Sequence, residues 1–273
     1  MIRGLSKSGL GSITDEQLIA KAAEYGFGVV DIDAKALVEK HGEQGAAKLL
    51  SDHHVTLGSI GLNVEWRGTD EQFREGLKQL PLHAAAAAQL GCTACCTYIL
   101  PSTDYKSALF TALAVARLRL IADILDAYGI RFALEFVGPH HLRTAWANPF
   151  IWTVEETLAL ISAINRPNVG LLVDAYHCHT TGFTPEHLRG LRPEQVVHVH
   201  INDARDLPVA ELLDNDRLYP GEGIIDLKGF LAALADIGYK GPVVQEILTR
   251  TAPEETPDEL LSRSKAGFDK VFA

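Results

Sequence analysis

Residues 169–174 have the sequence VGLLVD, a short and nearly uninterrupted apolar run that ends in an aspartate. Such a run is typical of a parallel strand that is buried on both faces of its sheet. Similar runs occur in IRFALEF (130–136) and VVHVHIND (196–203). A charged or imidazole group at the end of a buried strand is costly unless a partner neutralises it. These strand ends are therefore where the sequence indicates function.

Apolar runs of this kind alternate with helical patterns along the whole chain. The expected strands are 2–5, 27–32, 55–61, 93–98, 130–136, 169–174, 195–201 and 242–247. Eight strands that alternate with helices in 273 residues predict an α/β fold, the (β/α)8 TIM barrel. A doubly wound open sheet is the alternative. No linker or low-complexity tract interrupts the pattern, so we expect one TIM-barrel domain over residues 1–273.

Local signals predict where several helices begin and end. Thr14 and Gln17 have the spacing of a capping box, which opens the first helix. Pro81 predicts a kink or a break inside a helical stretch. The other expected helices are 71–90, 105–128, 154–164, 227–237 and 257–271. The glycine-rich stretch SGLGS (8–12) does not fit a nucleotide-binding G-x-G-x-x-G motif and is expected to be a loop.

Composition and charge describe an ordinary globular protein and argue against two classes of partner. Hydrophobic residues make up 47% of the chain and charged residues 22%, and the net charge is −10. An acidic chain is poorly suited to nucleic acid, because binding there rests on Lys and Arg that neutralise phosphates. No apolar run is long enough to cross a membrane, and the N-terminus has no signal-peptide pattern. We therefore expect no nucleic-acid or membrane partner and a cytoplasmic location.

The four cysteines are expected to be structural. Cys92 and Cys95 formally fit a redox or zinc half-site, but no second C-x-x-C follows. The surrounding CTACCTY is typical of a strand that is rich in small residues. We expect buried thiols here, as well as at Cys96 and Cys178.

Four strand-end side chains are the candidate metal ligands: Glu135, Asp174, His200 and Glu246. A TIM barrel carries its active site at the C-terminal ends of its strands, so these four side chains should meet at one mouth. Three carboxylates and one imidazole suit Mn²⁺, Mg²⁺ or Co²⁺ and permit Zn²⁺. The structural alternatives are a buried ion pair for Glu135 and a helix N-cap for Asp174.

Other polar and aromatic side chains are candidates for substrate contacts. His177 follows Asp174 by three residues, so a helical turn there would bring both to one site. His198 faces the same side of its strand as the predicted ligand His200 but lies deeper, which favours a supporting histidine. Arg205 lies in the loop above that strand, where it would hold substrate or form a surface ion pair. Trp66 could supply an apolar wall for a sugar ring, and core packing is the alternative.

The chain resembles the sugar phosphate isomerase/epimerase family, whose fold is the xylose isomerase-like TIM barrel, and within it the inosose isomerase-like members of inositol catabolism. The resemblance covers essentially the whole chain. It is densest in ALEFVGP, NVGLLVDAYHCHTTG, HVHINDARD, YPGEGIIDLKGFLAAL and the strand that ends in Glu246. These motifs are specific for the superfamily and weak for the substrate, which would be a small sugar or polyol. Homo-oligomers are common among such proteins.

The resemblance implies roles for individual residues. Glu135, Asp174, His200 and Glu246 would ligate one divalent metal, and the two glutamates would also serve as the acid/base pair. His177 would contact substrate, and Arg205 and Arg217 are weaker matches to the family pattern. The implied reaction is isomerisation or epimerisation of a keto sugar or keto-inositol through a metal-stabilised enediolate.

Three other functions are weighed against this one. A dehydratase of the inosose or dehydroshikimate type would use the same metal site, and a sugar-binding barrel would bind without turnover. Endonuclease IV-type repair enzymes share the superfamily but need further ligands for a three-metal cluster. The third strand of this chain has no histidine, and 214–216 are Asp-Asn-Asp instead of Asp-x-His. The incomplete cluster argues against nucleic-acid hydrolysis.

Overall fold

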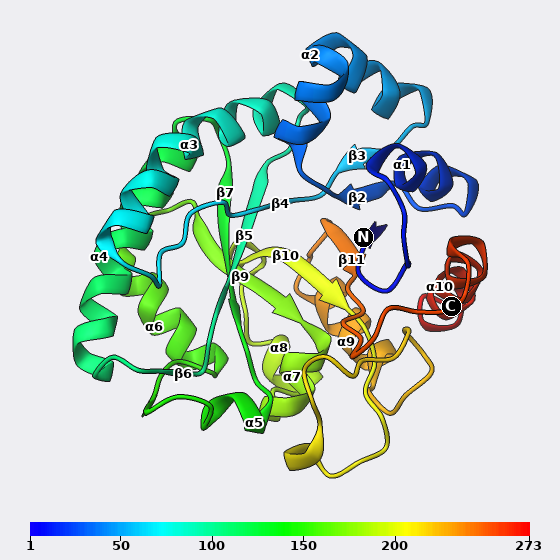
Figure 1. Ribbon diagram of the computed structural model, residues 1–273. Coiled ribbons are helices and arrows are strands. Elements are labelled where there is room, and N and C mark those ends of the chain that lie inside the picture. The colour runs from blue at the N-terminus through cyan, green and yellow to red at the C-terminus, as the bar shows by residue number, and fades with distance from the viewer.

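A ring of parallel strands forms the centre of the computed structural model, which describes residues 1–273. Helices surround this ring on the outside (Figure 1). The ring strands are β1 (Ile2–Ser6), β2 (Val29–Asp31), β3 (Thr56–Leu57), β4 (Ile60–Gly61), β5 (Ala94–Ile99), β7 (Arg131–Phe136), β9 (Val169–Asp174), β10 (Val196–Ile201) and β11 (Pro242–Gln245). Because β3 and β4 are two halves of one predicted strand, these nine strands fill eight barrel positions.

The first and last strands of the ring are neighbours, which distinguishes a barrel from an open sheet. β1 pairs in parallel with β2 on one side and with β11 on the other. One joint in the ring lacks direct pairing. There β3 pairs with β2 and β4 pairs with β5, and residues 58–59 connect the two halves. The prediction of a (β/α)8 barrel is confirmed.

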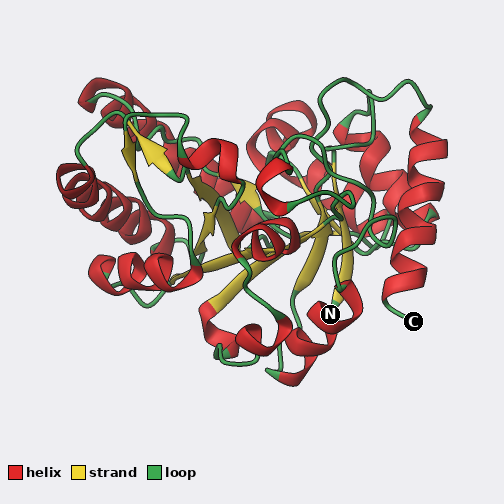
Figure 2. Cartoon of the chain, turned by 90° about the horizontal axis from the view of Figure 1, so that it is seen from below, coloured by secondary structure: helices red, strands yellow, loops and turns green.

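Long helices alternate with the barrel strands and pack around them, as the view at right angles also shows (Figure 2). They are α1 (Asp15–Glu24), α2 (Ala34–Asp52), α3 (Asp70–Gln89), α4 (Ser107–Asp126), α6 (Val154–Ile164), α9 (Leu227–Asp236) and α10 (Pro257–Val271). The short elements are α5 (His140–Arg143), α7 (Ala175–Thr181), α8 (Pro185–Leu188), the 3-10 turns η1 (Pro193–Gln195) and η2 (Val209–Glu211), and the antiparallel pair β6 (Ser102–Thr103) and β8 (Asn148–Pro149).

Local signals in the sequence account for most helix boundaries. The capping box at α1 is confirmed, because Thr14 Oγ1 accepts a hydrogen bond from the Gln17 N–H and the Gln17 side chain accepts one from the Thr14 N–H. Pro81 lies inside α3 without dividing it into two helices. Helix α2 is absent from the expected helices. Its pattern is interrupted at Gly42, which has φ 69° and ψ 164°.

The apolar core has two main parts and a small third cluster of Tyr176, Ala204 and Leu212. The larger part lies mainly between the helices and the outer face of the barrel. The smaller part fills the barrel interior and consists of Ala94, Ala133, Leu172 and Val197. Side chains alternate along a strand, so Ala133 faces the same way as Glu135, and Leu172 the same way as Asp174. The barrel interior is therefore apolar below and polar at its C-terminal mouth.

Three of the four cysteines are buried as expected, and Cys96 is only partly buried. All four cysteines are free. Burial raises the pKa of the Cys92 thiol to about 12, so it stays protonated at neutral pH and is a poor nucleophile. None of the helices combines the length and apolar character required to cross a membrane.

Candidate metal centre

The four predicted ligands meet at the C-terminal mouth of the barrel. One possible ligand atom from each of Glu135, Asp174, His200 and Glu246 lies within 4.8 Å of the other three. His200 Nδ1 is 3.4 Å from Glu246 Oε2, 3.5 Å from Glu135 Oε1 and 3.9 Å from Asp174 Oδ2. The group therefore comes from the ends of four successive barrel strands, β7, β9, β10 and β11.

Two atoms of this group are buried and have no hydrogen-bond partner. They are Glu135 Oε1 and His200 Nδ1, which face one another. Unpaired buried polar atoms are rare in folded proteins, and each one calls for a partner. A divalent cation would satisfy both atoms at once, and oxygen and imidazole donors suit Mn²⁺, Mg²⁺, Co²⁺ or Zn²⁺. The side chains present therefore fit one such ion.

Asp174 serves two purposes with its two oxygens. Oδ1 caps α7 by accepting hydrogen bonds from the N–H groups of Tyr176 and His177, at 2.7 and 3.1 Å. Oδ2 accepts from Asn202 Nδ2 at 2.8 Å and from Arg217 Nη1 at 3.1 Å, and it is the oxygen that faces His200. The N-cap alternative and the ligand prediction thus apply to different atoms of one carboxylate, and the cap fixes its orientation.

Arg217 enters the site from the loop after β10. Its Nη1 donates to Asp174 Oδ2 and to Glu246 Oε2, at 3.1 and 2.9 Å, and its Nη2 donates to Asp214 Oδ1 at 2.7 Å. The side chain is only 1% exposed. Its backbone N–H donates to the carbonyl oxygen of Leu248, which anchors this part of the loop. Of the two arginines matched to the family pattern, the structure brings this one to the ligands.

The charges in the site influence one another strongly. Burial alone would raise the pKa of Glu246, but His200 and Arg217 outweigh it and hold this pKa well below its usual range. Burial raises the pKa of Glu135, and the nearby Glu246 adds to the effect. Against the effect of its own burial, His200 has its pKa raised well above the usual value by Glu246, Asp31 and Glu135. Among the protein's own groups, His200 and Arg217 are the cations that balance a surplus of carboxylates.

Asp203 organises the loop that carries Arg217. It is fully buried, and its carboxylate accepts hydrogen bonds from the backbone N–H groups of Gly221, Gly223 and Ile225, at 3.0, 2.9 and 2.9 Å. Gly223 is required here, since a Cβ would lie 2.0 Å from a backbone oxygen. The loop is therefore tied to the end of β10 rather than free above the mouth.

His177 lies beside the ligand group, on α7. Its Nδ1 accepts a hydrogen bond from the Gly138 N–H at 3.3 Å, and its Nε2 lies 3.3 Å from Arg217 Nη2. Nε2 is 3.9 Å from both Glu135 Oε1 and Asp214 Oδ1. The prediction that a helical turn brings His177 and Asp174 to one site is confirmed.

Trp66 and Arg205 are not brought to the ligand group. Trp66 has no exposed surface, its Nε1 donates to Thr97 Oγ1 at 3.2 Å, and its ring stacks on Phe110. This corrects the expectation of an apolar wall, because no face of Trp66 is open to a substrate. Arg205 forms an ion pair with Asp216 at 2.9 Å, and its side chain is 49% exposed. The structure therefore favours the surface ion pair for Arg205.

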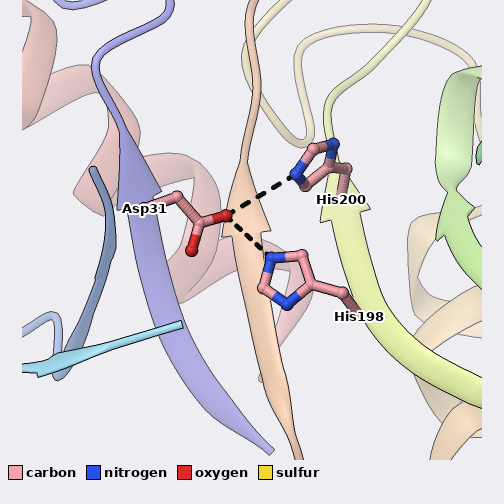
Figure 3. A group of neighbouring side chains, drawn as sticks. All are labelled: Asp31, His198 and His200. Carbon is pink, nitrogen blue, oxygen red and sulfur yellow. Dashed lines mark hydrogen bonds and ion pairs between the residues drawn. The ribbon is translucent and has the colours of Figure 1, made fainter. Parts of the chain in front are cut away.

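Asp31 is absent from the residues predicted from the sequence, yet it contacts both histidines of β10. Its Oδ2 lies 2.7 Å from His198 Nε2 and 3.7 Å from His200 Nε2 (Figure 3). His198 is fully buried and partnered, as predicted for a supporting histidine. The signal for Asp31 is present in the sequence: VVD ends a buried strand in the same way as VGLLVD.

Comparisons with known proteins place this chain in a family. The family model described as "Xylose isomerase-like TIM barrel" matches residues 19–266. The inosose isomerase of Bacillus subtilis (strain 168) is 35% identical over 145 residues, which cover 53% of this chain and 50% of that protein. The ketose 3-epimerase of Arthrobacter globiformis is 26% identical over 238 residues, with 84% and 75% covered. The chain thus spans about half the length of the inosose isomerases that it matches.

Solved structures agree with the family match. A xylose isomerase domain protein from Alicyclobacillus acidocaldarius is 33% identical and has a TM-score of 0.92, with 99% of this chain and 98% of that chain covered. The IolI protein, solved with a bound zinc atom, has a TM-score of 0.82 at 23% identity, with the same shares covered. At that identity, the likeness to IolI shows the fold alone.

Proposed function

The chain belongs to the xylose isomerase-like TIM-barrel family, and from this premise we propose that it is a divalent-metal-dependent isomerase or epimerase of a keto sugar or keto-inositol. The observation that carries the proposal is the convergence of Glu135, Asp174, His200 and Glu246 within 4.8 Å. These four residues would hold the ion. The inosose isomerase and ketose 3-epimerase among its relatives support this class of reaction.

The chemistry requires a proton to leave the carbon beside a carbonyl and another to return. A bound divalent ion would supply a Lewis acid that polarises this carbonyl. Glu246 is the proposed base, because His200 and Arg217 keep its carboxylate ionised. Glu135 is the proposed partner that carries the returning proton, in line with the pKa that burial raises. Two carboxyl groups whose surroundings push their pKa values apart are well suited to exchange roles of acid and base.

Arg217 and His177 would orient the substrate. Arg217 has its guanidinium held by three carboxylates, so its positive charge stays at a fixed place beside the ligand group. His177 has its Nε2 3.9 Å from both Glu135 Oε1 and Asp214 Oδ1, and 3.3 Å from Arg217 Nη2. We propose that both face hydroxyl or carbonyl oxygens of the substrate, Arg217 through its positive charge and His177 through its ring.

A recess at the C-terminal end of β5 suits the remainder of a sugar or polyol. Tyr98 on β5 is the register partner of Glu135 on β7, so the two side chains leave the sheet on the same face. Tyr98 lines a recess of about 340 Å³ together with Arg67 and Trp146. Aromatic faces combined with polar groups are a common lining for small-molecule sites. Trp146, rather than Trp66, is thus the tryptophan that is open to a ligand.

Metal content and product mass together test the proposal. Elemental analysis should find about one divalent metal per chain, and this metal should be lost in a Glu135→Ala/Glu246→Ala double variant. Glu155→Ala, at an exposed position on α6, is the control and should retain the ion. A screen of keto sugars and inosose should then give a product with unchanged mass. No metal, and no gain in thermal stability with Mn²⁺, Co²⁺ or Zn²⁺, would contradict the proposal.

The same screen separates the other functions. A dehydratase that uses this site would give a product lighter by one water. A sugar-binding barrel would bind ligand and metal but give no product at any metal loading.

A further inference from the structure

One carboxylate lies behind the histidine of the ligand group, on the side away from the other ligands. Asp31 ends β2, and its side chain reaches across the barrel interior to the two histidines of β10 (Figure 3). Its Oδ2 lies 2.7 Å from His198 Nε2 and 3.7 Å from His200 Nε2. A single oxygen therefore faces a ring nitrogen of each histidine.

The two nitrogens of His200 face opposite kinds of neighbour. Nδ1 is the atom that lies 3.4 to 3.9 Å from the oxygens of Glu135, Asp174 and Glu246. Nε2 is the atom that faces Asp31. A neutral imidazole carries one proton, and its other nitrogen has the free lone pair that binds a metal. A carboxylate beside Nε2 favours the proton there and leaves Nδ1 free.

An irregularity in the barrel holds Asp31 in place. The third barrel position is interrupted between β3 and β4, and the N–H of Ser59 there donates to Asp31 Oδ1 at 2.7 Å. Gly58 makes room for this contact, because a Cβ at that position would lie 2.5 Å from Asp31 Oδ1. The break in the strand therefore fixes Asp31 Oδ1 through a backbone N–H and leaves Oδ2 to face the histidines.

A second metal ion bound by Asp31, His198 and His200 is the competing explanation, since their donor atoms also lie within 4.8 Å of one another. The 2.7 Å between Asp31 Oδ2 and His198 Nε2 is a hydrogen-bond distance. An ion bound to these two atoms would have to replace this hydrogen bond. His200 would also have to bind two ions through both nitrogens. The geometry therefore favours a hydrogen-bonded support.

We propose that Asp31 is a positioning residue that fixes the ring orientation and the tautomer of His200, so that Nδ1 is the nitrogen that binds the ion. Carboxylates that accept the second N–H of a metal-binding histidine orient the ring and raise its basicity. This inference rests on the proposed function, because it assumes that the four ligand atoms hold a divalent ion.

Metal affinity is the readout, measured by calorimetry or chelator competition with Mn²⁺ and Zn²⁺ on purified protein. Asp31→Asn keeps the shape of the side chain but has only one oxygen. It therefore cannot accept one hydrogen bond from the Ser59 N–H and another from a histidine. We expect it to weaken metal binding by about 10- to 100-fold. Asp33→Asn, which removes the same charge at an exposed position two residues later, is the control and should bind within about twofold of wild type.

A second pair of variants keeps the test decisive if Asp31→Asn does not fold. Gly58→Ala would push the Asp31 carboxylate out of place, and its Cβ would also crowd Val29 Cγ1 at 2.6 Å, but it would touch none of the proposed ligands. We expect metal binding to weaken by about tenfold. Gly61→Ala is its matched control on the same interrupted strand, because a Cβ there would meet nothing within 4 Å. It should bind the metal as wild type does.

The outcomes separate this inference from the proposed function. Wild-type affinity in folded Asp31→Asn and Gly58→Ala, or a crystal structure in which His200 binds Zn²⁺ through Nε2, would overturn the positioning role and leave the metal site standing. A wild-type protein that binds neither Mn²⁺ nor Zn²⁺ would overturn both. Weaker binding in these two variants, with unchanged controls and Nδ1 on the metal, is the result that we expect.

Discussion

The two halves of the barrel mouth are built differently. On one side, β7, β9 and β10 are six residues long, and the group of candidate ligands lies at or beside their ends and that of β11. On the other side, β2 has three residues and β3 and β4 have two each, with a break between them. The ligand half, β7, β9, β10 and the four-residue β11, carries the groups that would meet ion and substrate. Asp31 ends β2 and Ser59 lies in the break between β3 and β4, and both belong to the proposed support of His200.

This difference shows that regular and irregular parts of one barrel have separate tasks. A long paired strand fixes the position of a side chain at its end, as the proposed ligands require. A broken strand releases a backbone N–H from the sheet, and here that N–H binds a carboxylate. Substitutions on the ligand half should therefore affect chemistry, and those on the supporting half should affect how tightly the ion is held.

The contrast between the halves should be largest at Glu246. Glu246→Gln is nearly isosteric, so the fold should survive, but the amide cannot take up a proton. We expect turnover to fall by about 10³-fold or more, measured as kcat on a metal-replete sample, with an unchanged melting temperature. Retained turnover would show that Glu246 is not the acid/base residue and that another group transfers the proton.

The two histidines of β10 belong to different halves of this comparison: His200 is a proposed ligand, and His198 is a partner of Asp31. His200→Gln removes a proposed ligand, and we expect metal affinity to fall by about a hundredfold or more. His198→Gln removes only a partner of Asp31, and we expect a loss of about tenfold or less. Calorimetric titration with Mn²⁺ compares the two. The reverse order would mean that His198 is the ligand and that the ion binds deeper in the barrel than proposed.

A lower pH should weaken metal binding gradually, and this effect is smaller than those of the ligand substitutions. The pKa of His200 is raised well above its usual value, so the ring is protonated at neutral pH in the metal-free protein. An ion that binds to Nδ1 must displace a proton, so affinity should rise with pH, by about tenfold per unit where one proton is released. Titrations in buffers of different ionisation enthalpy would count this proton. Binding without proton release would show that His200 is not a ligand.

The smallest effect is expected at Arg205, which lies on the ligand half but in a surface ion pair. Arg205→Ala should change the free energy of unfolding by about 0.5 kcal/mol or less and leave kcat/KM unaltered. Chemical denaturation and initial rates would measure both. A large loss of kcat/KM would show that the loop rearranges when substrate binds and brings Arg205 inward.

Strand ends were readable from the sequence because each ligand follows a long apolar run. The rule works at Glu135 and Asp174, where burial on both faces makes a terminal carboxylate conspicuous. It applies equally to Asp31, but VVD is too short a run to stand out, and its partners are distant in the chain. Arg217 shows another limit: it lies in a loop, and only the three carboxylates gathered around it in space mark it as part of the site.

The carboxylate of Asp203 divides the long loop after β10 into two parts with different freedom for protein engineering. Residues 218–225 are tied to the end of the strand by backbone bonds to Asp203, so a graft there would also displace the guanidinium next to them. Residues 205–211 are exposed. A protein engineer can therefore lengthen, shorten or randomise residues 205–211 to change what the barrel mouth admits, while the group of candidate ligands keeps its arrangement.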